Sequence, residues 1–231
     1  MLRQEKKYLM TLLDGQRLCA RLSGFLLEDA HSGAQGYAVR SLYFDTLDDG
    51  DYQDKMEGLE LRRKLRLRIY DPAAGFAMLE MKQKEGAYQK KRSLRLDREA
   101  AERLIRGDFR PLLDCGGSFA AECFGLMQAR CYRPRAVVEY QRRAFIAKEN
   151  QIRITLDSRI TATEACWDLF SPRLVQYPVL DPYQRGAGGE VQRLPAQLHQ
   201  NPGQRGQPLR DHPEQILSGQ KRGAALSELS G

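Results

Sequence analysis

The chain has 231 residues, of which 42% are hydrophobic and 29% are charged, which indicates one large globular domain or a domain with an appendage. No apolar run approaches the roughly 20 residues that a transmembrane helix needs, and the charged first residues form no secretory signal, so we expect a cytoplasmic protein. Lys and Arg number 37 against 30 Asp and Glu, and the resulting net charge of +7 favours polyanionic partners.

The hydrophobic pattern predicts helices and strands in a mixed order. In chain order it predicts a helix within 11–30, strands at 37–44, 58–70, 75–84 and 92–96, helices at 97–105 and 118–130, and strands at 135–147 and 151–157. Most neighbouring strands are joined by short polar turns or by turns that contain Gly and Pro. We therefore expect antiparallel pairing and an α+β fold with a core rich in strands.

The composition changes beyond Tyr183. All aromatic residues and all cysteines lie at or before that point, while 184–231 are rich in Gln, Gly, Arg and Pro and have no sustained periodicity. This composition is typical of a disordered tail. We therefore predict a domain at 1–183 and a disordered tail at 184–231.

Two predicted strands each carry charged residues at alternate positions. These are Lys64, Arg66 and Arg68 in the first strand and Glu80, Lys82 and Lys84 in the second. One interpretation is that this face meets water, as in many antiparallel sheets. Against it, like charges about 7 Å apart repel by roughly 2 kcal/mol at an effective dielectric constant of ~20. The alternative is a face that binds phosphates, and a closed barrel would turn it into the lining of a basic tunnel.

The cysteines and histidines indicate no catalytic or metal-binding chemistry. The five cysteines are widely spaced and never form a Cys-x-x-Cys motif, which argues against a disulfide framework and a zinc site. The three histidines are isolated in polar surroundings, so we interpret them as surface residues.

Eight short motifs follow one another along the chain. They are RQEKKY at 3–8, RSLYFDT at 40–46, the Tyr, Lys and Gly at 52, 55 and 58, RRKLRLRIY at 62–70, LEMKQK at 79–84, KRS at 91–93, VEYQRRAF at 138–145 and RITLD at 153–157. In this order they resemble the VTC-type polyphosphate polymerase domain, a branch of the triphosphate tunnel metalloenzymes in the CYTH-like superfamily. The resemblance runs from residue 3 to about residue 182.

The resemblance implies an antiparallel β tunnel barrel with flanking helices, in which basic side chains hold a nucleoside triphosphate and a growing phosphate chain. The implied catalytic cations are Arg66, Arg68, Lys82, Lys91, Arg142 and Arg153. The implied substrate-binding residues are Lys7, Lys64, Lys84 and Tyr140. Phosphoryl transfer needs in-line positioning and cancellation of phosphate charge more than covalent help from the protein, and such residues supply both.

Two glutamates are candidates for holding Mn²⁺ or Mg²⁺. Glu5 and Glu80 could bind the metal directly or through water, because hard cations take carboxylates beside substrate phosphates. Alternatively, each glutamate could neutralise neighbouring lysines. The triphosphatase relatives carry Glu-x-Glu-x-Lys in the first strand, and Arg3 stands here in place of the first glutamate. That difference favours a polymerase over a triphosphatase.

The chain departs from the family after the sequence PVLDP at 178–182. The family continues with a strand of the form Leu-Glu-Val-Lys-Tyr, whose glutamate binds the metal, and ends near Ser-Lys-Tyr. This chain has GGEVQR at 188–193 instead. Codons exist for which a one-base shift restores both family motifs, so our hypothesis is a frameshift around residues 183–188. We then expect a barrel incomplete at its C-terminal strands and a chain that is inactive as encoded.

The expected reaction transfers the γ-phosphoryl group of ATP to inorganic polyphosphate. ATP and polyphosphate are thus the expected partners, no specific nucleic acid is expected, and a membrane partner stays open. One alternative is a triphosphate hydrolase of the same fold. Another is a non-catalytic module that binds polyanions or RNA, which is less favoured because aliphatic rather than aromatic residues lie between the basic positions.

Overall fold

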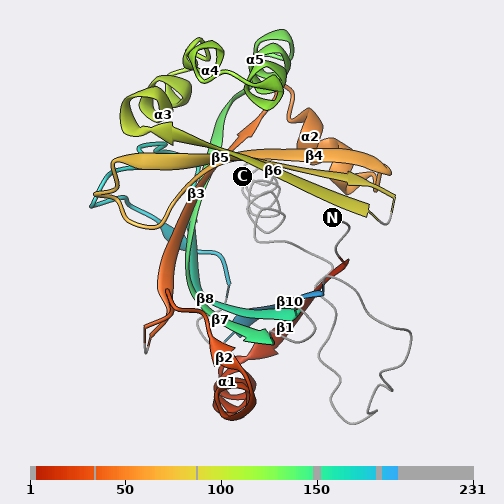
Figure 1. Ribbon diagram of the computed structural model, residues 1–231, viewed down its shortest axis with the longest axis vertical. Coiled ribbons are helices and arrows are strands. Elements are labelled where there is room, and N and C mark those ends of the chain that lie inside the picture. The colour runs from red at the N-terminus through yellow and green to blue at the C-terminus, as the bar shows by residue number, and fades with distance from the viewer. Residues whose placement is uncertain (1–3, 34, 87, 148–151, 181–183, 192–231) are drawn as a thin grey trace, which may run out of the picture. The chain divides into compact units, whose positions relative to one another are not determined.

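The computed structural model describes residues 4–33, 35–86, 88–147, 152–180 and 184–191, without the side chains of 4–6, 88 and 184–191. The chain forms two compact units. Among the described residues, the first comprises residue 4 and the ranges within 38–139 and 163–175, and the second comprises those within 5–37, 140–162 and 176–191. Figure 1 labels their helices and strands.

The first unit is an antiparallel sheet with helices on it. Its elements are β3 (Tyr37–Asp45), α2 (Gly50–Met56), β4 (Leu61–Ile69), β5 (Phe76–Glu85), β6 (Tyr88–Asp97), α3 (Arg98–Ile105), α4 (Pro111–Asp114), α5 (Ser118–Ala129) and the first half of β7 (Arg133–Ala147). The strand order is β7-β3-β4-β5-β6, and the pairs β3·β4, β4·β5 and β5·β6 are antiparallel. The α+β class predicted from the sequence is confirmed.

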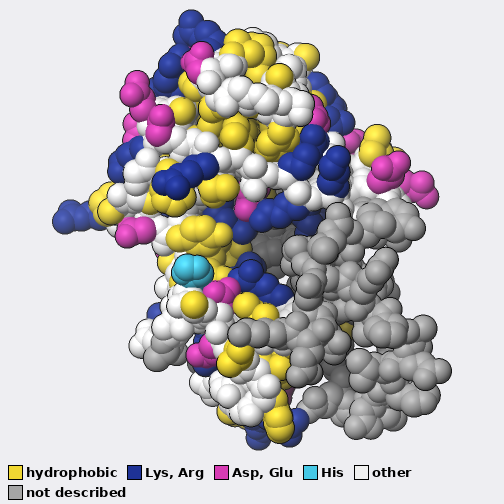
Figure 2. Space-filling model, in the orientation of Figure 1, with side chains coloured by type: hydrophobic (Ala, Val, Ile, Leu, Met, Phe, Trp, Pro, Cys, Tyr) yellow, Lys and Arg dark blue, Asp and Glu magenta, His cyan; other side chains and the backbone are white. Residues whose placement is uncertain are grey.

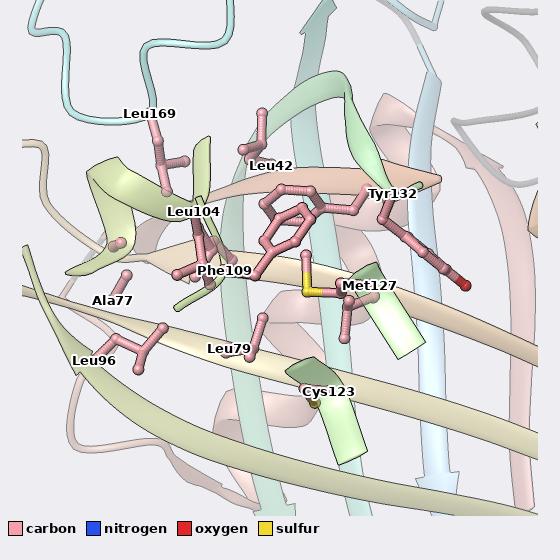
Figure 3. Packing of buried hydrophobic residues seen from close by; sticks show 14 of the residues in the cluster. Leu42, Ala77, Leu79, Leu96, Leu104, Phe109, Cys123, Met127, Tyr132 and Leu169 are labelled. Atoms are coloured by element: carbon pink, nitrogen blue, oxygen red, sulfur yellow. The ribbon is translucent and has the colours of Figure 1, made fainter. Parts of the chain in front are cut away.

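The alternation predicted for 58–70 is confirmed in β4. Leu65, Leu67 and Ile69 are at most 1% exposed and lie in the main hydrophobic core, while the charged residues between them lie on the opposite face. Residues of α3, α4 and α5 complete this core, and Figure 3 shows Leu104 and Met127 pointing toward the strand residue Leu79. In Figure 1 the three helices lie together on one side of β4, β5 and β6. One face of the sheet therefore holds the core and the other is left for polar chemistry.

The ends of α3 follow the capping rules. Asp97 accepts a hydrogen bond from the Ala100 amide at 2.7 Å, which satisfies one of the open N–H groups of the first turn. Gly107 has φ +85°, a left-handed conformation that glycine adopts without strain. The helix predicted at 97–105 is therefore confirmed.

The short helix α2 was not predicted. Its start depends on Asp45, whose carboxylate accepts hydrogen bonds from the amides of Thr46, Asp51 and Tyr52. A seven-residue helix is too short for a clear hydrophobic period, and Asp45 lies five residues before its first residue, Gly50.

The second unit contains the remaining strands and the first helix. Its elements are β1 (Gln4–Thr11), α1 (Leu12–Phe25), β2 (Leu27–Glu28), the second half of β7, β8 (Ile152–Thr163), β9 (Tyr177–Pro178) and β10 (Gln184–Val191). The strand order is β1-β10-β8-β7, with β2 paired to β7 and β9 to β8. A small core forms where Cys19 of α1 meets Phe145 and Leu156 of the strands. The helix predicted at 11–30 ends early because residues 27–28 pair with β7.

The strand β10 corrects one prediction from the sequence, the disordered tail. Residues 184–191 are not a disordered tail, because they pair antiparallel with β8, from Gly186 opposite Asp157 to Val191 opposite Ile152. In the strand order of the described residues, β1 and β6 are the two end strands, so the sheet is not closed, which agrees with the predicted incomplete barrel. Strand pairing uses backbone amides and carbonyls, which any composition supplies, so the Gly-rich sequence hid the strand. The tail predicted for 192–231 lies outside the described residues.

Among the described residues, no helix is both long and apolar enough to cross a membrane.

Candidate functional site

A basic face covers one side of β4, β5 and β6. Residues opposite each other in the strand register share a face, and here Lys64, Lys82 and Lys91 form one row across the three strands. We define the basic face as the eight cations at these alternating positions: Arg62, Lys64, Arg66, Arg68, Lys82, Lys84, Lys91 and Arg95. In the segments 62–68, 78–84 and 89–95, Glu80 is the one acidic residue on this face. In Figure 2, Lys and Arg side chains are prominent at the level of these strands.

Glu80 is the centre of this face. Its carboxylate is 4% exposed and contacts three cations. Arg66 approaches Oε2 with Nε at 2.9 Å and Nη2 at 2.7 Å, and Arg68 Nη1 lies 3.6 Å from the same oxygen. Lys91 Nζ lies 2.6 Å from Oε1. One negative charge thus holds three positive charges together.

The charge of Glu80 is stabilised by these neighbours. Burial by itself raises the pKa of Glu80, but the combined charges of Arg66, Arg68 and Lys91 outweigh it and lower the pKa to about 2. Burial also lowers the pKa of Lys91, although Glu80 opposes that change. At neutral pH Glu80 is therefore ionised, and this group of four side chains keeps an excess of positive charge.

Two hydroxyl groups from β3 hold the same arginines from the other side. Tyr43 lies opposite Arg66 in the register, and its hydroxyl accepts a hydrogen bond from Arg66 Nη1 at 2.9 Å. Ser41 lies opposite Arg68 and accepts a hydrogen bond from its Nε at 3.3 Å. The Tyr43 ring also lies within cation–π distance of Arg66, at 5.7 Å, and of Lys64, at 6.0 Å. Ser41 and Tyr43 were not predicted as site residues, although their alternate positions in the motif RSLYFDT place them on one face of the strand.

Arg142 has its own acidic partner in the second unit. Its guanidinium makes two parallel bonds to Asp157, each of 2.7 Å, and lies 5.0 Å from the centre of the Tyr140 ring. Burial disfavours the charged form, but the interactions with Tyr140 and Asp157 outweigh it and raise the pKa of Arg142 well above its usual value. This arginine is a permanent cation in a fixed orientation.

Arg153, another predicted cation of the second unit, is also held by neighbouring side chains. Its Nη2 donates to Asp29 at 2.7 Å and to the Tyr37 hydroxyl at 2.9 Å. Asp29 and Tyr37 were not predicted as site residues. They follow the first helix in the sequence, where no charge alternation marks them.

The predicted site residues therefore fall into two groups. The first unit brings together Lys64, Arg66, Arg68, Glu80, Lys82, Lys84 and Lys91 on the basic face. The second unit holds Lys7, Tyr140, Arg142 and Arg153. Glu5 lies in β1, but its side chain is outside the described part.

The described side chains do not fit a metal ion held by Glu80. Both carboxylate oxygens already contact cations, and a divalent ion there would face three positive charges. In the part of the chain that the structure describes, no group of three or more His, Cys, Asp or Glu could hold a metal. Of the two roles considered for Glu80, the geometry favours the neutralising one.

A further acidic position was missed by the sequence analysis. Glu190 lies in β10 opposite Arg153, on a strand that neighbours the β1 of Glu5. The signal was present, because Glu190 and Val191 match the Glu-Val of the family strand. The frameshift hypothesis has no support from this in-frame strand.

Comparisons with known proteins found a matching family model and several similar solved structures. The family model described as the VTC domain matches residues 2–198. No curated protein matches the chain. A "putative adenylate cyclase" from Bacillus halodurans has 14% identity, with 84% of this chain and 83% of that chain covered and a TM-score of 0.50. The PH1012 protein of Pyrococcus horikoshii has 11% identity, with 84% and 80% covered and a TM-score of 0.40. The PH1819 protein of the same organism has 9% identity, with 95% and 86% covered and a TM-score of 0.42.

Proposed function

The chain belongs to the VTC domain family, and on this premise we propose that it is a polyphosphate polymerase, which transfers the γ-phosphoryl group of ATP to a polyphosphate chain. The observation that carries the proposal is the basic face. Eight cations share it with one carboxylate, and three lysines stand directly opposite one another. Like charges placed opposite each other destabilise a sheet, so this arrangement is best explained by a polyanionic ligand.

Arg66 and Arg68 are the proposed phosphate-binding centre. Their planar guanidinium groups are oriented before the substrate arrives, by Glu80 on one side and by β3 hydroxyls on the other. Guanidinium groups bind phosphate oxygens with two parallel hydrogen bonds, and fixed donors need no reorganisation as charge develops during transfer. These residues would stabilise the charge on the transferred phosphoryl group.

The lysines of the basic face would hold the phosphate chain. Lys82 and Lys84 are two residues apart, which places successive side chains about 7 Å apart along the strand. Lys91 is half exposed, so its ammonium can reach a ligand while it stays near Glu80. A row of flexible point charges suits a polymer that must advance after each addition.

A divalent cation, Mn²⁺ or Mg²⁺, remains part of the proposal as the companion of the phosphates. It would screen the negative charge of the phosphate oxygens. Of the two predicted glutamates, Glu5 is the one proposed to hold it, because Glu80 is already paired with three cations. The contributions of Arg66, Arg68 and the lysines do not depend on this assignment.

The test is the product formed from ATP. The 231-residue chain is incubated with ATP and Mn²⁺ or Mg²⁺, and the products are separated on a gel stained for polyphosphate while free phosphate is measured. We expect long chains, and we expect Arg66→Ala to abolish them. Arg110→Ala, at an arginine that is 74% exposed and bound to Asp108, is the matched control and should keep full activity. Free phosphate without chains would indicate a triphosphate hydrolase, and no turnover by the intact protein would contradict the proposal.

A further inference from the structure

Strand β3 contributes a repeated contact to the basic face. Its residues alternate between the two sides of the sheet, so Leu42 and Phe44 enter the hydrophobic core while Tyr43 lies on the other side. Ser41 and Tyr43 are two residues apart, and each accepts a hydrogen bond from the arginine opposite. The same contact thus occurs twice along one strand.

The Tyr43 contact restricts Arg66 in a way that Glu80 alone does not. Glu80 receives two nitrogens of Arg66 on one oxygen, Nε at 2.9 Å and Nη2 at 2.7 Å. A guanidinium bound on a single oxygen can still tilt about it, because one point of contact does not fix a plane. Tyr43 binds the remaining nitrogen, Nη1, at 2.9 Å. All three nitrogens of the group are then held from two neighbouring strands.

We propose that Tyr43 is a positioning residue, which acts through Arg66 by fixing the plane of its guanidinium for phosphate binding. The proposal adds a residue to the proposed function, and it rests on that function for the assumption that Arg66 binds phosphate. A bidentate contact to phosphate requires the correct plane, and an error of a few tenths of an ångström or 10–20° weakens it. Tyr43 needs no contact with the substrate to play this part.

The phenol oxygen can be removed with little other change. Tyr43→Phe keeps the ring beside Arg66 and Lys64, so the cation–π contacts are retained, and it leaves Leu42 and Phe44 in the core. The variant should melt within about 2 °C of the original chain, because it loses a single partly exposed hydrogen bond. Tyr177→Phe, at a tyrosine that is 67% exposed in β9, is the matched control.

The first measurement follows Arg66 directly in the full chain without substrate. Nitrogen-15 NMR of arginine side chains reports hydrogen exchange at Arg66 Nε, identified by its absence in Arg66→Lys. Tyr43→Phe should accelerate this exchange by about fivefold, which corresponds to the loss of one hydrogen bond that holds the group. Tyr177→Phe should leave it unchanged. An unchanged rate in Tyr43→Phe would overturn the proposal.

The second measurement is a double-mutant cycle on tripolyphosphate binding. Tyr43→Phe should weaken affinity about fivefold to tenfold in the original chain and should have no further effect in Arg66→Ala. Equal losses in both backgrounds would mean that Tyr43 acts independently of Arg66, and the proposal would be wrong. If the original chain binds no tripolyphosphate, the proposed function fails, and the exchange measurement alone decides whether Tyr43 positions Arg66.

Discussion

Glu80 shows how a buried carboxylate can organise a basic site at the residue scale. Its negative charge lies within 3.6 Å of three cations and lowers the repulsion between them. In return, the cations keep Glu80 ionised despite its burial. A site of lysine and arginine alone would have no carboxylate to fix the positions of the cations and to lower the repulsion between them.

The low pKa of Glu80 predicts a specific acid sensitivity. The pKa falls from 4.5 to about 2 on folding, so Glu80 contributes stability above pH 4.5 and loses it as the pH falls toward 2. The full contribution is about 3 kcal/mol at neutral pH. Glu80→Gln should therefore unfold more easily at pH 7, and its deficit should shrink between pH 4.5 and 2.5 in urea titrations. Glu60→Gln, at an exposed position, is the control, and a constant deficit for Glu80→Gln would refute this account.

Asp51 predicts the opposite pH dependence. It is 4% exposed, and burial raises its pKa from 3.8 to about 6, although Tyr132 donates a hydrogen bond to it at 2.6 Å. The folded protein therefore holds this proton more tightly than the unfolded chain, and stability contributed by Asp51 falls as the pH rises from about 4 to 6.

Replacing this carboxylate should remove that dependence. Asp51→Asn should gain about 3 kcal/mol of unfolding free energy relative to the original chain as the pH rises from 4 to 7. Urea titrations at each pH measure the difference. An Asn variant whose curve stays parallel to that of the original chain would show that Asp51 ionises normally.

At the scale of elements, the strands of the first unit were the most predictable part. In β4, Leu65 and Leu67 alternate with Arg66 and Arg68, and this period of two fixed both the core face and the basic face.

Other features could not be predicted because their signals lie outside the element itself. The start of α2 depends on Asp45 of the preceding strand, and β10 depends on the open edge of β8. The ion pairs of Arg142 with Asp157 and of Arg153 with Asp29 join residues whose contact depends on tertiary structure. Alternation showed which cations share a face, but not which carboxylates would meet them.

The row formed by Lys64, Lys82 and Lys91 is expected to lower the stability of the fold while it strengthens phosphate binding. Lys82 lies opposite both Lys64 and Lys91, so Lys82→Gln should relieve repulsion and raise the unfolding free energy by about 0.5 kcal/mol. The same change should weaken tripolyphosphate binding severalfold, because one cation of the basic face is lost. Lys90→Gln, on the same pair of strands but on the opposite face, should change neither quantity. A Lys82→Gln variant with unchanged affinity would exclude Lys82 from the binding site.

At the scale of the whole molecule, the distribution of charge is the main support for the proposed binding of a polyanion. The net charge of +7 is modest for 231 residues, but eight cations gather on one face around a single carboxylate. A polyanion attracted to such a surface is bound more weakly as salt screens the charges. The proposed function makes polyphosphate the polyanion to test first.

Calorimetric titration of tripolyphosphate into the full chain tests this account most directly. The account predicts saturable binding that weakens between low and physiological salt, a roughly tenfold to hundredfold loss in Arg66→Ala, and no change in Arg110→Ala. An absence of binding by the original chain, or equal affinity in all three proteins, would contradict it.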